Sequence, residues 1–225
     1  VIRMTKLLLP VVMLTCLAMW SFADASENNA QQLKFKVFLD DDEIGFHKLA
    51  VSPIEGGEAV SIEASFDIEI IFINVFSYRH QADEVWQQGC VVSLNSATTE
   101  NSDKEFVKSS IIDGALQVES VEHNARLTGC VSSFAYWDVK RLQTEYLLNS
   151  QTGEYVPAEL TALGQSSFEF SGNISAATQY RLFAEDAFID LWYDDNNVWM
   201  ALQTKVNGGR VLTYYRDDSV AVTKR

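Results

Sequence analysis

The sequence contains few residues of the kinds that carry most enzyme chemistry. It has three histidines and three cysteines in 225 residues, and its cysteines are too widely spaced to form a CxxC pair. No serine lies in a G-x-S-x-G nucleophile motif, and glycine-rich phosphate loops are absent. These absences speak against a serine or cysteine nucleophile, a cysteine-ligated metal site and a dinucleotide or P-loop enzyme.

Basic residues are also scarce. The chain has 17 Lys and Arg against 31 Asp and Glu, a formal charge of −14. A surface of this sign repels phosphate groups, so we expect neither nucleic acid nor an anionic membrane surface as a partner. Hydrophobic residues make up 47% and charged residues 21%, as is usual for folded globular domains, so the composition does not indicate bulk disorder.

Long apolar runs are confined to the beginning of the chain. Residues 7–20 are apolar, follow the basic Arg3 and Lys6, and precede the small-x-small triplet Ala23–Ala25. This order is typical of a secretory signal peptide, and the run is short for a membrane span. We predict a cleaved signal peptide over residues 1–25 and a periplasmic or secreted protein, in a Gram-negative envelope, that meets the membrane only through this segment. An uncleaved anchor is the alternative.

Cleavage would leave two cysteines in the mature chain, Cys90 and Cys130. In an oxidising compartment we expect them to form a disulfide, which removes about 4 kcal/mol of denatured-state entropy for a loop of this length. Two buried thiols are the alternative. A lipoprotein acylated at Cys16 would require a small residue at Thr15.

The rest of the chain alternates between apolar and polar residues. The clearest case is Val60–Ile70 (VSIEASFDIEI), which separates completely into two faces only as a strand. We expect further strands at Leu33–Leu39, Ile44–Val51, Phe76–Val85, Val91–Ser96, Glu105–Ile112, Leu116–Val121, Leu147–Leu148, Tyr155–Leu160, Ser167–Phe170, Thr178–Leu182, Phe188–Asp194, Val198–Val206 and Arg210–Tyr215.

These spacings predict an all-β, mainly antiparallel fold: a curved sheet or partial β-barrel. We expect one short helix, Ser133–Gln143, covering one mouth of the barrel and anchored by Cys130. The expected organisation is a polar tether at 26–32, a single domain at 33–216 and a tail at 217–225.

Several stretches together carry a family resemblance: FKVFLDDDEIGFH, SFDIEIIFINVFSYRHQADEVWQQGC, GCVSSFAYWD, LLNSQTGEYVP and LWYDDNNVWMALQTKVNGGRVLTYY. With them the chain resembles an uncharacterised family of exported bacterial proteins, a domain of unknown function. The resemblance implies an exported all-β protein and no established activity. Its general pattern is also similar to half-barrel folds that cradle lipid in the bacterial envelope, which is an analogy of fold alone.

The acidic stretch FLDDDEIGFH suggests a ligand cluster when read alone. Because it joins two alternating segments, we expect Asp40–Glu43 to form an exposed hairpin turn. Gly45 is expected to permit a bulge or close packing. Calcium binding is the alternative, but the spacing of an EF-hand is missing.

His80 and Glu84 are the most suggestive titratable pair. On a helix they would be neighbours, but on a strand they would lie about 13 Å apart, too far to share an ion. We therefore expect no catalytic residue, no metal and no cofactor. An envelope enzyme using His80, Glu84 and His47 is the alternative.

Aromatic residues cluster in two places, in the segment expected to be helical and in the last strands. They are Phe134, Tyr136, Trp137, Trp192, Tyr193, Trp199, Tyr214 and Tyr215. Such rings line hydrophobic pockets, although they also form ordinary cores. We predict a non-enzymatic protein that binds a lipid or another apolar small molecule; the alternative is a scaffold subunit of an envelope complex. The predicted ligand-binding residues are His47, Tyr78, His80, Trp86, Tyr136 and Trp137.

Overall fold

The computed structural model describes residues 30–70, 73–170 and 172–217, and it confirms the all-β prediction. The predicted signal peptide lies outside the described residues. The strands are β1 Gln31–Leu39, β2 Asp42–Ile54, β3 Gly57–Ile70, β4 Ile73–Gln87, β5 Cys90–Glu100, β6 Asp103–Ile112, β7 Ala115–Ser120, β8 Asn124–Leu127, β9 Tyr146–Leu148, β10 Tyr155–Phe170, β11 Asn173–Ala184, β12 Ala187–Tyr193, β13 Trp199–Lys205 and β14 Val211–Arg216. Within the described residues, no helix is long and apolar enough to cross a bilayer.

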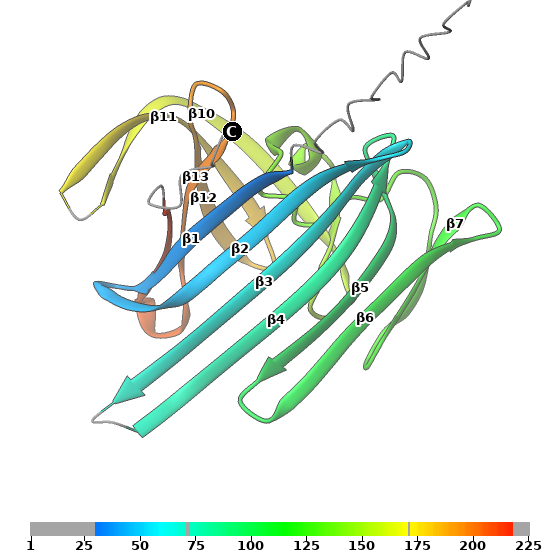
Figure 1. Ribbon diagram of the computed structural model, residues 1–225, viewed down its shortest axis with the longest axis horizontal. Helices are drawn as coiled ribbons and strands as arrows, with labels where there is room; N and C mark the ends of the chain where they lie inside the picture. Colours follow the sequence, from blue (N-terminus) through cyan, green and yellow to red (C-terminus); the bar gives the residue numbers. More distant parts are fainter. Residues whose placement is uncertain (1–29, 71–72, 171, 218–225) are drawn as a thin grey trace, which may run out of the picture.

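All fourteen strands belong to one curved antiparallel sheet (Figure 1). Its order is β8-β7-β6-β5-β4-β3-β2-β1-β14-β13-β12-β11-β10-β9. Consecutive strands therefore pair everywhere except between β8 and β9, and the pairing of β1 with β14 joins the two ends of the described chain. The two edges of the sheet, β8 and β9, are consecutive in the chain. The sheet is therefore an up-and-down meander closed at its termini and open between β8 and β9.

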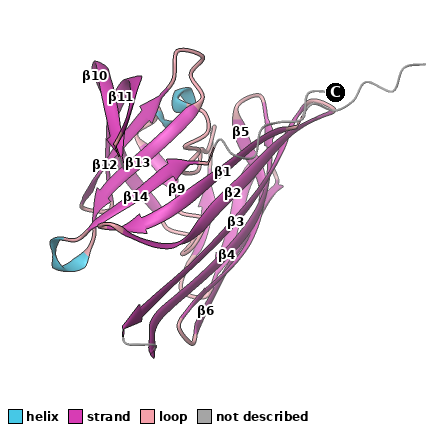
Figure 2. Cartoon of the chain, turned by 60° about the vertical axis from the view of Figure 1, so that its left-hand side comes forward, coloured by secondary structure: helices cyan, strands magenta, loops and turns pink. Residues whose placement is uncertain are grey.

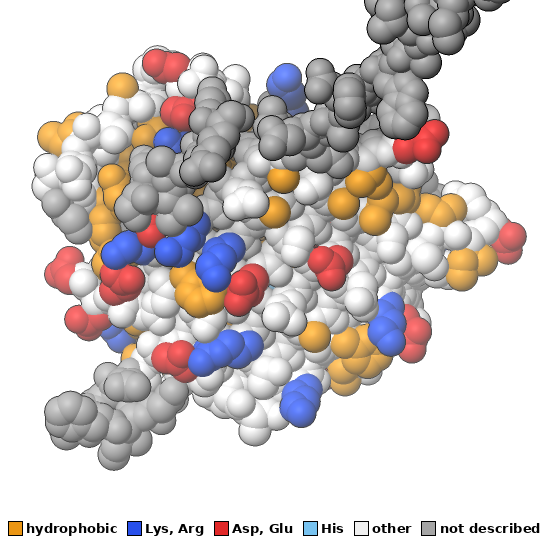
Figure 3. Space-filling view, in the orientation of Figure 1, with side chains coloured by type: hydrophobic (Ala, Val, Ile, Leu, Met, Phe, Trp, Pro, Cys, Tyr) orange, Lys and Arg blue, Asp and Glu red, His pale blue; other side chains and the backbone are white. Residues whose placement is uncertain are grey.

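Alternation places apolar residues on the concave face. Phe35, Leu94, Leu191 and Trp199 are among its fully buried side chains and belong to one large core. The outer face of the first strands carries cross-strand ion pairs, such as Lys48–Glu63 at 3.4 Å. Basic and acidic side chains lie close together on that face (Figure 3). The period-two pattern of the sequence thus becomes one packed and one solvated surface.

The acidic stretch forms a hairpin turn, as predicted. The turn at Asp40 and Asp41 joins β1 to β2, and the pairing of the two strands shifts register where Val37 faces Gly45. A Cβ at Gly45 would stand 1.9 Å from the carbonyl oxygen of Ser65, so only glycine fits this bulge. Asp40 accepts hydrogen bonds from Arg210 (2.7 Å) and from the backbone of the β14 segment, which lower the pKa of its exposed carboxyl.

The connection between the two sheet edges, residues 128–145, is here called the strap. The concave face of the curved sheet forms a trough, with the N-terminal strands as one wall and the C-terminal strands as the other. The strap enters this trough (Figure 2). The helix predicted over Ser133–Gln143 is wrong: only Val139–Leu142 forms a 3-10 turn, capped by the Asp138 side chain. The rest of the strap is irregular, with a turn at Tyr136 and Trp137, and some of its backbone carbonyls accept hydrogen bonds from neighbouring strands. Val131 accepts from Val91 of β5 at 2.8 Å.

The predicted disulfide is confirmed. Cys90, the first residue of β5, is bonded to Cys130 in the strap. Two further contacts hold the strap to the other half of the sheet: the Ser132 carbonyl accepts from Leu148 of β9 (2.8 Å), and the Tyr136 carbonyl accepts from the Tyr193 hydroxyl of β12 (2.7 Å). The strap therefore bridges both walls of the trough.

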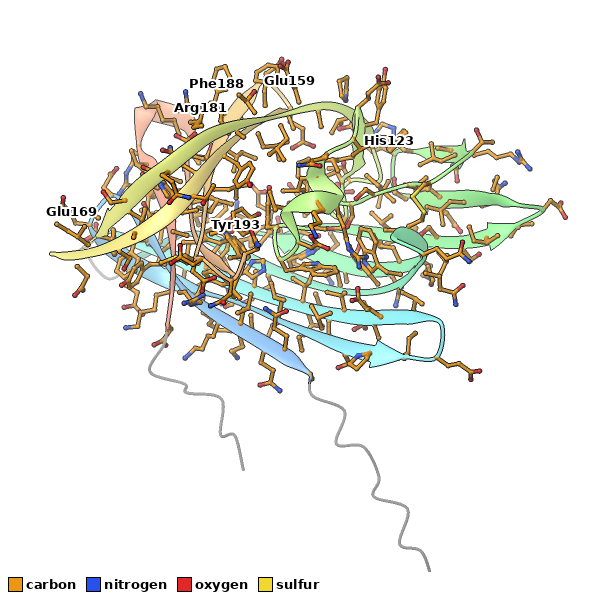
Figure 4. All side chains as sticks on the ribbon, turned by 90° about the horizontal axis from the view of Figure 1, so that it is seen from above. His123, Glu159, Glu169, Arg181, Phe188 and Tyr193 are labelled. Carbon is orange, nitrogen blue, oxygen red and sulfur yellow. A yellow bond between two sulfur atoms is a disulfide. The ribbon has the colours of Figure 1, made fainter. Side chains whose placement is uncertain are left out.

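The long β10–β11 hairpin curls over the outer surface of the C-terminal strands. Its Phe168 packs with Trp192, centroids 4.8 Å apart, in a small separate core that also contains Ala177 and Ala201. Tyr193, the next residue after Trp192, lies inside the trough, whereas Phe188 lies on the outer side (Figure 4). The C-terminal aromatics thus divide between two cores on opposite faces.

Candidate ligand-binding cavity

A cavity of about 190 Å³ lies between the concave face of the sheet and the strap. Strands β2, β3 and β4 supply one wall, β12, β13 and β14 the other, and the strap contributes Phe134, Tyr136 and Trp137. The exposed Gln151 and Glu185 stand at its rim, so the cavity reaches solvent there.

One row of paired residues explains why space remains at this position. His47, Ala64, His80 and Thr98 lie opposite one another across β2, β3, β4 and β5. Adjacent strands are about 4.8 Å apart, so the two histidine backbones are separated by about 10 Å. The methyl group of Ala64 is too small to fill the space between the two imidazoles.

His80 is tied to the cavity wall by two hydroxyl groups. Its Nδ1 lies 2.8 Å from Thr98 Oγ1, and its Nε2 lies 3.5 Å from Ser150 Oγ. Burial lowers the pKa of His80 to about 4, so its imidazole is neutral at neutral pH. This neutral ring can donate one hydrogen bond and accept another.

His47 is surrounded by aromatic rings. Its ring centroid is 5.4 Å from Tyr214, 5.8 Å from Trp199 and 6.2 Å from Phe35. No hydrogen bond joins the His47 ring to another of the described residues. Burial, with a smaller contribution from His80, lowers the pKa of His47 to about 3. His47 therefore presents a neutral, unpaired imidazole beside the cavity.

Three phenols complete the polar lining: Tyr78 from β4, Tyr136 from the strap and Tyr214 from β14. Burial raises the pKa of all three hydroxyls well above the usual range, so they remain protonated. Apart from Glu185 at the rim, the cavity is thus lined by apolar side chains and by neutral groups that can donate or accept hydrogen bonds.

Glu84 lies on the same face of β4 as His80 but outside the cavity. Its Oε2 accepts hydrogen bonds from Trp86 Nε1 (2.7 Å) and Ser133 Oγ (3.0 Å). Burial raises the pKa of this carboxyl, while the two hydrogen bonds and the Arg141 charge lower it. Its contacts make Glu84 an anchor for the strap.

Arg141 completes this network from the strap. Its guanidinium lies 4.5 Å from the ring centroid of Trp86 and 4.4 Å from that of Trp137, and it pairs with Glu58 at 2.5 Å. We call Glu84, Trp86, Ser133, Trp137 and Arg141 the strap anchor. Trp86 belongs to this anchor and does not line the cavity.

The structure places five of the six predicted ligand-binding residues around the cavity: His47, Tyr78, His80, Tyr136 and Trp137. It does not bring His47, His80 and Glu84 together, because Glu84 follows His80 by about 13 Å along one strand. Among the described residues, no group of three His, Cys, Asp or Glu side chains could hold a metal ion.

Other lining residues were not in the predicted set. Trp199 and Tyr214 stood out in the sequence as members of the C-terminal aromatic cluster, but Leu49 and Ile62 have no feature beyond strand alternation. Glu185 is one acid among 31, and only the fold brings it to the rim.

Comparison with known protein families covers almost all of the described sheet. A family model described as a domain of unknown function, DUF6134, matches residues 35–217. The chain belongs to this family. The match includes both walls of the cavity and the whole strap, so these features fall within the family domain. A comparison with curated proteins gave no match.

Proposed function

We propose that this member of the DUF6134 family is an exported, non-enzymatic protein that binds a small apolar molecule in the cavity beneath the strap. The single observation that carries the proposal is the cavity itself. It combines aromatic and aliphatic walls with a few neutral polar groups, the usual composition of a ligand site.

The size of the cavity limits what it can hold. A volume of about 190 Å³ is below the ~300 Å³ at which sites for drug-sized ligands begin, and it corresponds to about six water molecules. We therefore propose a small ligand, or one segment of a longer lipid whose remainder leaves the cavity past Gln151 and Glu185.

Two features support export. The first 25 residues have the pattern of a signal peptide. The Cys90–Cys130 disulfide connects the strap to the sheet, and such bonds persist in oxidising compartments. A periplasmic or secreted location would keep the strap tied down.

The binding test uses the mature chain purified under mild conditions. We expect native mass spectrometry to show a bound small molecule, or tryptophan fluorescence to change on addition of apolar ligands, since Trp137 and Trp199 line the cavity. A protein that neither carries nor takes up an apolar molecule would contradict the proposal.

A matched pair of variants locates the binding. Ala64→Leu places a larger side chain in the cavity between the two histidines, whereas Ala97→Leu makes the same change at an exposed position on β5. We expect Ala64→Leu to abolish binding and Ala97→Leu to retain it. Equal binding by both variants would place the ligand elsewhere.

A further inference from the structure

The charged side chain that lines the cavity is acidic, Glu185. No lysine or arginine occurs among the described residues that line it. The histidines cannot take the place of such a cation, because both are neutral at neutral pH. A carboxylate or phosphate headgroup would therefore lose its hydration without gaining a cationic partner.

The walls instead present aromatic rings around a common space. Trp199 is central to them: its centroid lies 5.4 Å from Tyr136, 5.8 Å from His47 and 6.2 Å from Tyr214. Its indole N–H is bonded to the Ala201 carbonyl at 2.9 Å, which fixes the orientation of the ring. Faces of Trp and Tyr rings attract organic cations, and several such faces form the cages that bind quaternary ammonium groups.

A carboxylate stands at the rim of the same space. Glu185, in the turn between β11 and β12, lies among the lining residues and is held by a hydrogen bond from Asn149 Nδ2 at 2.5 Å. Burial raises the pKa of the Tyr136 hydroxyl, with smaller contributions from Tyr214 and from the negative charge of Glu185. The net charge of −14 adds a long-range attraction for cations.

We infer that the cavity recognises an organic ammonium group, a quaternary ammonium or a protonated amine, whose charge lies between the aromatic rings and Glu185. This inference rests on the proposed ligand-binding function and specifies its ligand class. The ammonium group could belong to a free small molecule or to the headgroup of a lipid, because both have the same chemistry.

Pairs of ligands with and without a cationic headgroup provide the test. We would titrate the mature protein, followed by tryptophan fluorescence and calorimetry, with choline and its neutral isostere 3,3-dimethylbutan-1-ol. A second pair, decyltrimethylammonium and decanoate, adds an alkyl chain. Both compounds would be used below their critical micelle concentrations. We expect each cation to bind at least ~5-fold more tightly than its partner, as a desolvated cation–π contact of about 1 kcal/mol or more would give.

The outcomes separate the two proposals. Binding of 3,3-dimethylbutan-1-ol or decanoate as tightly as the cations would overturn the ammonium inference and leave the apolar-ligand function standing. If none of the four compounds binds and the protein carries no apolar molecule, both proposals fail. Choline binding indicates a free ammonium compound as the source; binding of decyltrimethylammonium alone indicates an alkylated headgroup.

Variants at the rim test the role of the carboxylate. Glu185→Gln keeps an oxygen for the Asn149 hydrogen bond but removes the charge, and we expect the cations to bind ~3-fold or more weakly. Asp186→Asn removes a charge from the next residue of the same turn, which does not line the cavity. Equal effects of the two changes on cation binding would contradict a specific role for Glu185.

A second pair tests the aromatic wall. Tyr136→Phe keeps the ring and should retain the preference for cations, whereas Tyr136→Leu removes the ring and should reduce it. Circular dichroism and the unfolding midpoint show whether each variant is folded. A folded Tyr136→Leu protein with unchanged preference would exclude this ring from the site.

Discussion

His80 and Glu84 lie four residues apart on the same face of β4, yet their surroundings differ sharply. Glu84 is enclosed by the strap anchor, where Trp86 and Ser133 donate to its carboxylate. His80 faces the cavity, where one nitrogen has a short contact with Thr98 and the other only a 3.5 Å contact with Ser150. The strap therefore packs closely at one end and leaves space at the other.

The comparison shows how one connection can both stabilise the sheet and form a site. At the anchor, large side chains and a guanidinium fill the space between the strap and the N-terminal strands. At the cavity, Ala64 occupies the middle strand of the row that carries the two histidines. This small residue leaves space at the cavity where large side chains fill it at the anchor.

The largest expected effect is a loss of protein stability at acidic pH, caused by the two cavity histidines. Because the pKa values of His47 and His80 in the folded state are about 3 and about 4, below the usual 6.5, the unfolded chain binds more protons as the pH falls. Stability from these groups is thus present above pH ~6.5 and is lost toward pH ~4, by up to about 2.7 kcal/mol per pH unit for two protons.

The raised pKa of Glu84 makes the folded state more stable as the pH falls, which opposes the effect of the histidines. The measurement therefore compares two proteins that both contain Glu84. Urea unfolding of the natural chain and of the double variant His47→Gln/His80→Gln, between pH 7 and about 4.5, should give a much flatter pH dependence for the variant. Parallel curves would show that the histidines are not buried in neutral form.

The second effect tests what ties the strap to the sheet. Replacing both Cys90 and Cys130 by serine removes a cross-link over a separation of 40 residues, which is expected to cost about 4 kcal/mol. Denaturant unfolding measures the loss, and limited proteolysis should cut first within residues 128–145. An unchanged midpoint would mean that the strap is held without the disulfide.

The third effect weakens the strap anchor at a residue that does not line the cavity. Glu84→Ala leaves the Trp86 N–H and the Ser133 hydroxyl without their acceptor, and we expect a loss of about 3 kcal/mol in urea unfolding. Glu84→Gln retains an acceptor oxygen and should lose less. Asp83→Ala, on the exposed face of the same strand, is the control and should change stability by less than about 0.5 kcal/mol.

The smallest expected effects come from larger side chains placed in the packed strap and in the cavity. Ala64 lines the cavity, and Ala135 lies in the strap at 1% exposure. Leucine at Ala135 should overpack the core at a cost of about 2 kcal/mol, whereas leucine at Ala64 has space and should change the free energy of unfolding by less than about 1 kcal/mol. Equal costs at the two positions would mean that the cavity collapses on itself.

Strand alternation and turn residues were sufficient to predict most of the sheet. The disulfide was also predicted from the sequence, because cleavage of the predicted signal peptide would leave only Cys90 and Cys130 to pair. The strand Asn124–Leu127 was not predicted, because four alternating residues are too short a run to stand out as a strand. Tyr155–Leu160 and Ser167–Phe170 were predicted as separate strands, but a bulge between Ala162 and Gly164 lets a single strand run through.

The strap shows why local pattern was insufficient for the predicted helix. Phe134, Tyr136 and Trp137 have low helix propensity. Backbone carbonyls of the strap accept hydrogen bonds from β5, β9 and β12, and the bonds within the strap are short-range turn contacts such as Asp138 N–H to the Ala135 carbonyl. Those partners are distant in the chain, so no local pattern contains them.

The cavity was predictable only in part. Alternation places Tyr78, His80 and Trp86 on one face of β4, but Trp86 is six residues from His80, about 20 Å along the strand. The extent of the cavity along that face depends on the strap, which determines which residues are covered. The approach of Glu185 to Tyr136 likewise depends on how the sheet curls.

The pairing of β1 with β14 has a consequence for how the protein assembles. Phe35 lies opposite Arg216, so this pairing joins segments about 180 residues apart, whereas every other strand pair in the sheet is nearly local. Closing so long a loop is entropically costly and slow, so this junction should form last. Until β14 pairs with it, β1 presents an unpaired edge that can pair with strands of other chains. If the chain is exported as proposed, chaperones that keep it unfolded until translocation is complete would protect this edge at its most vulnerable stage.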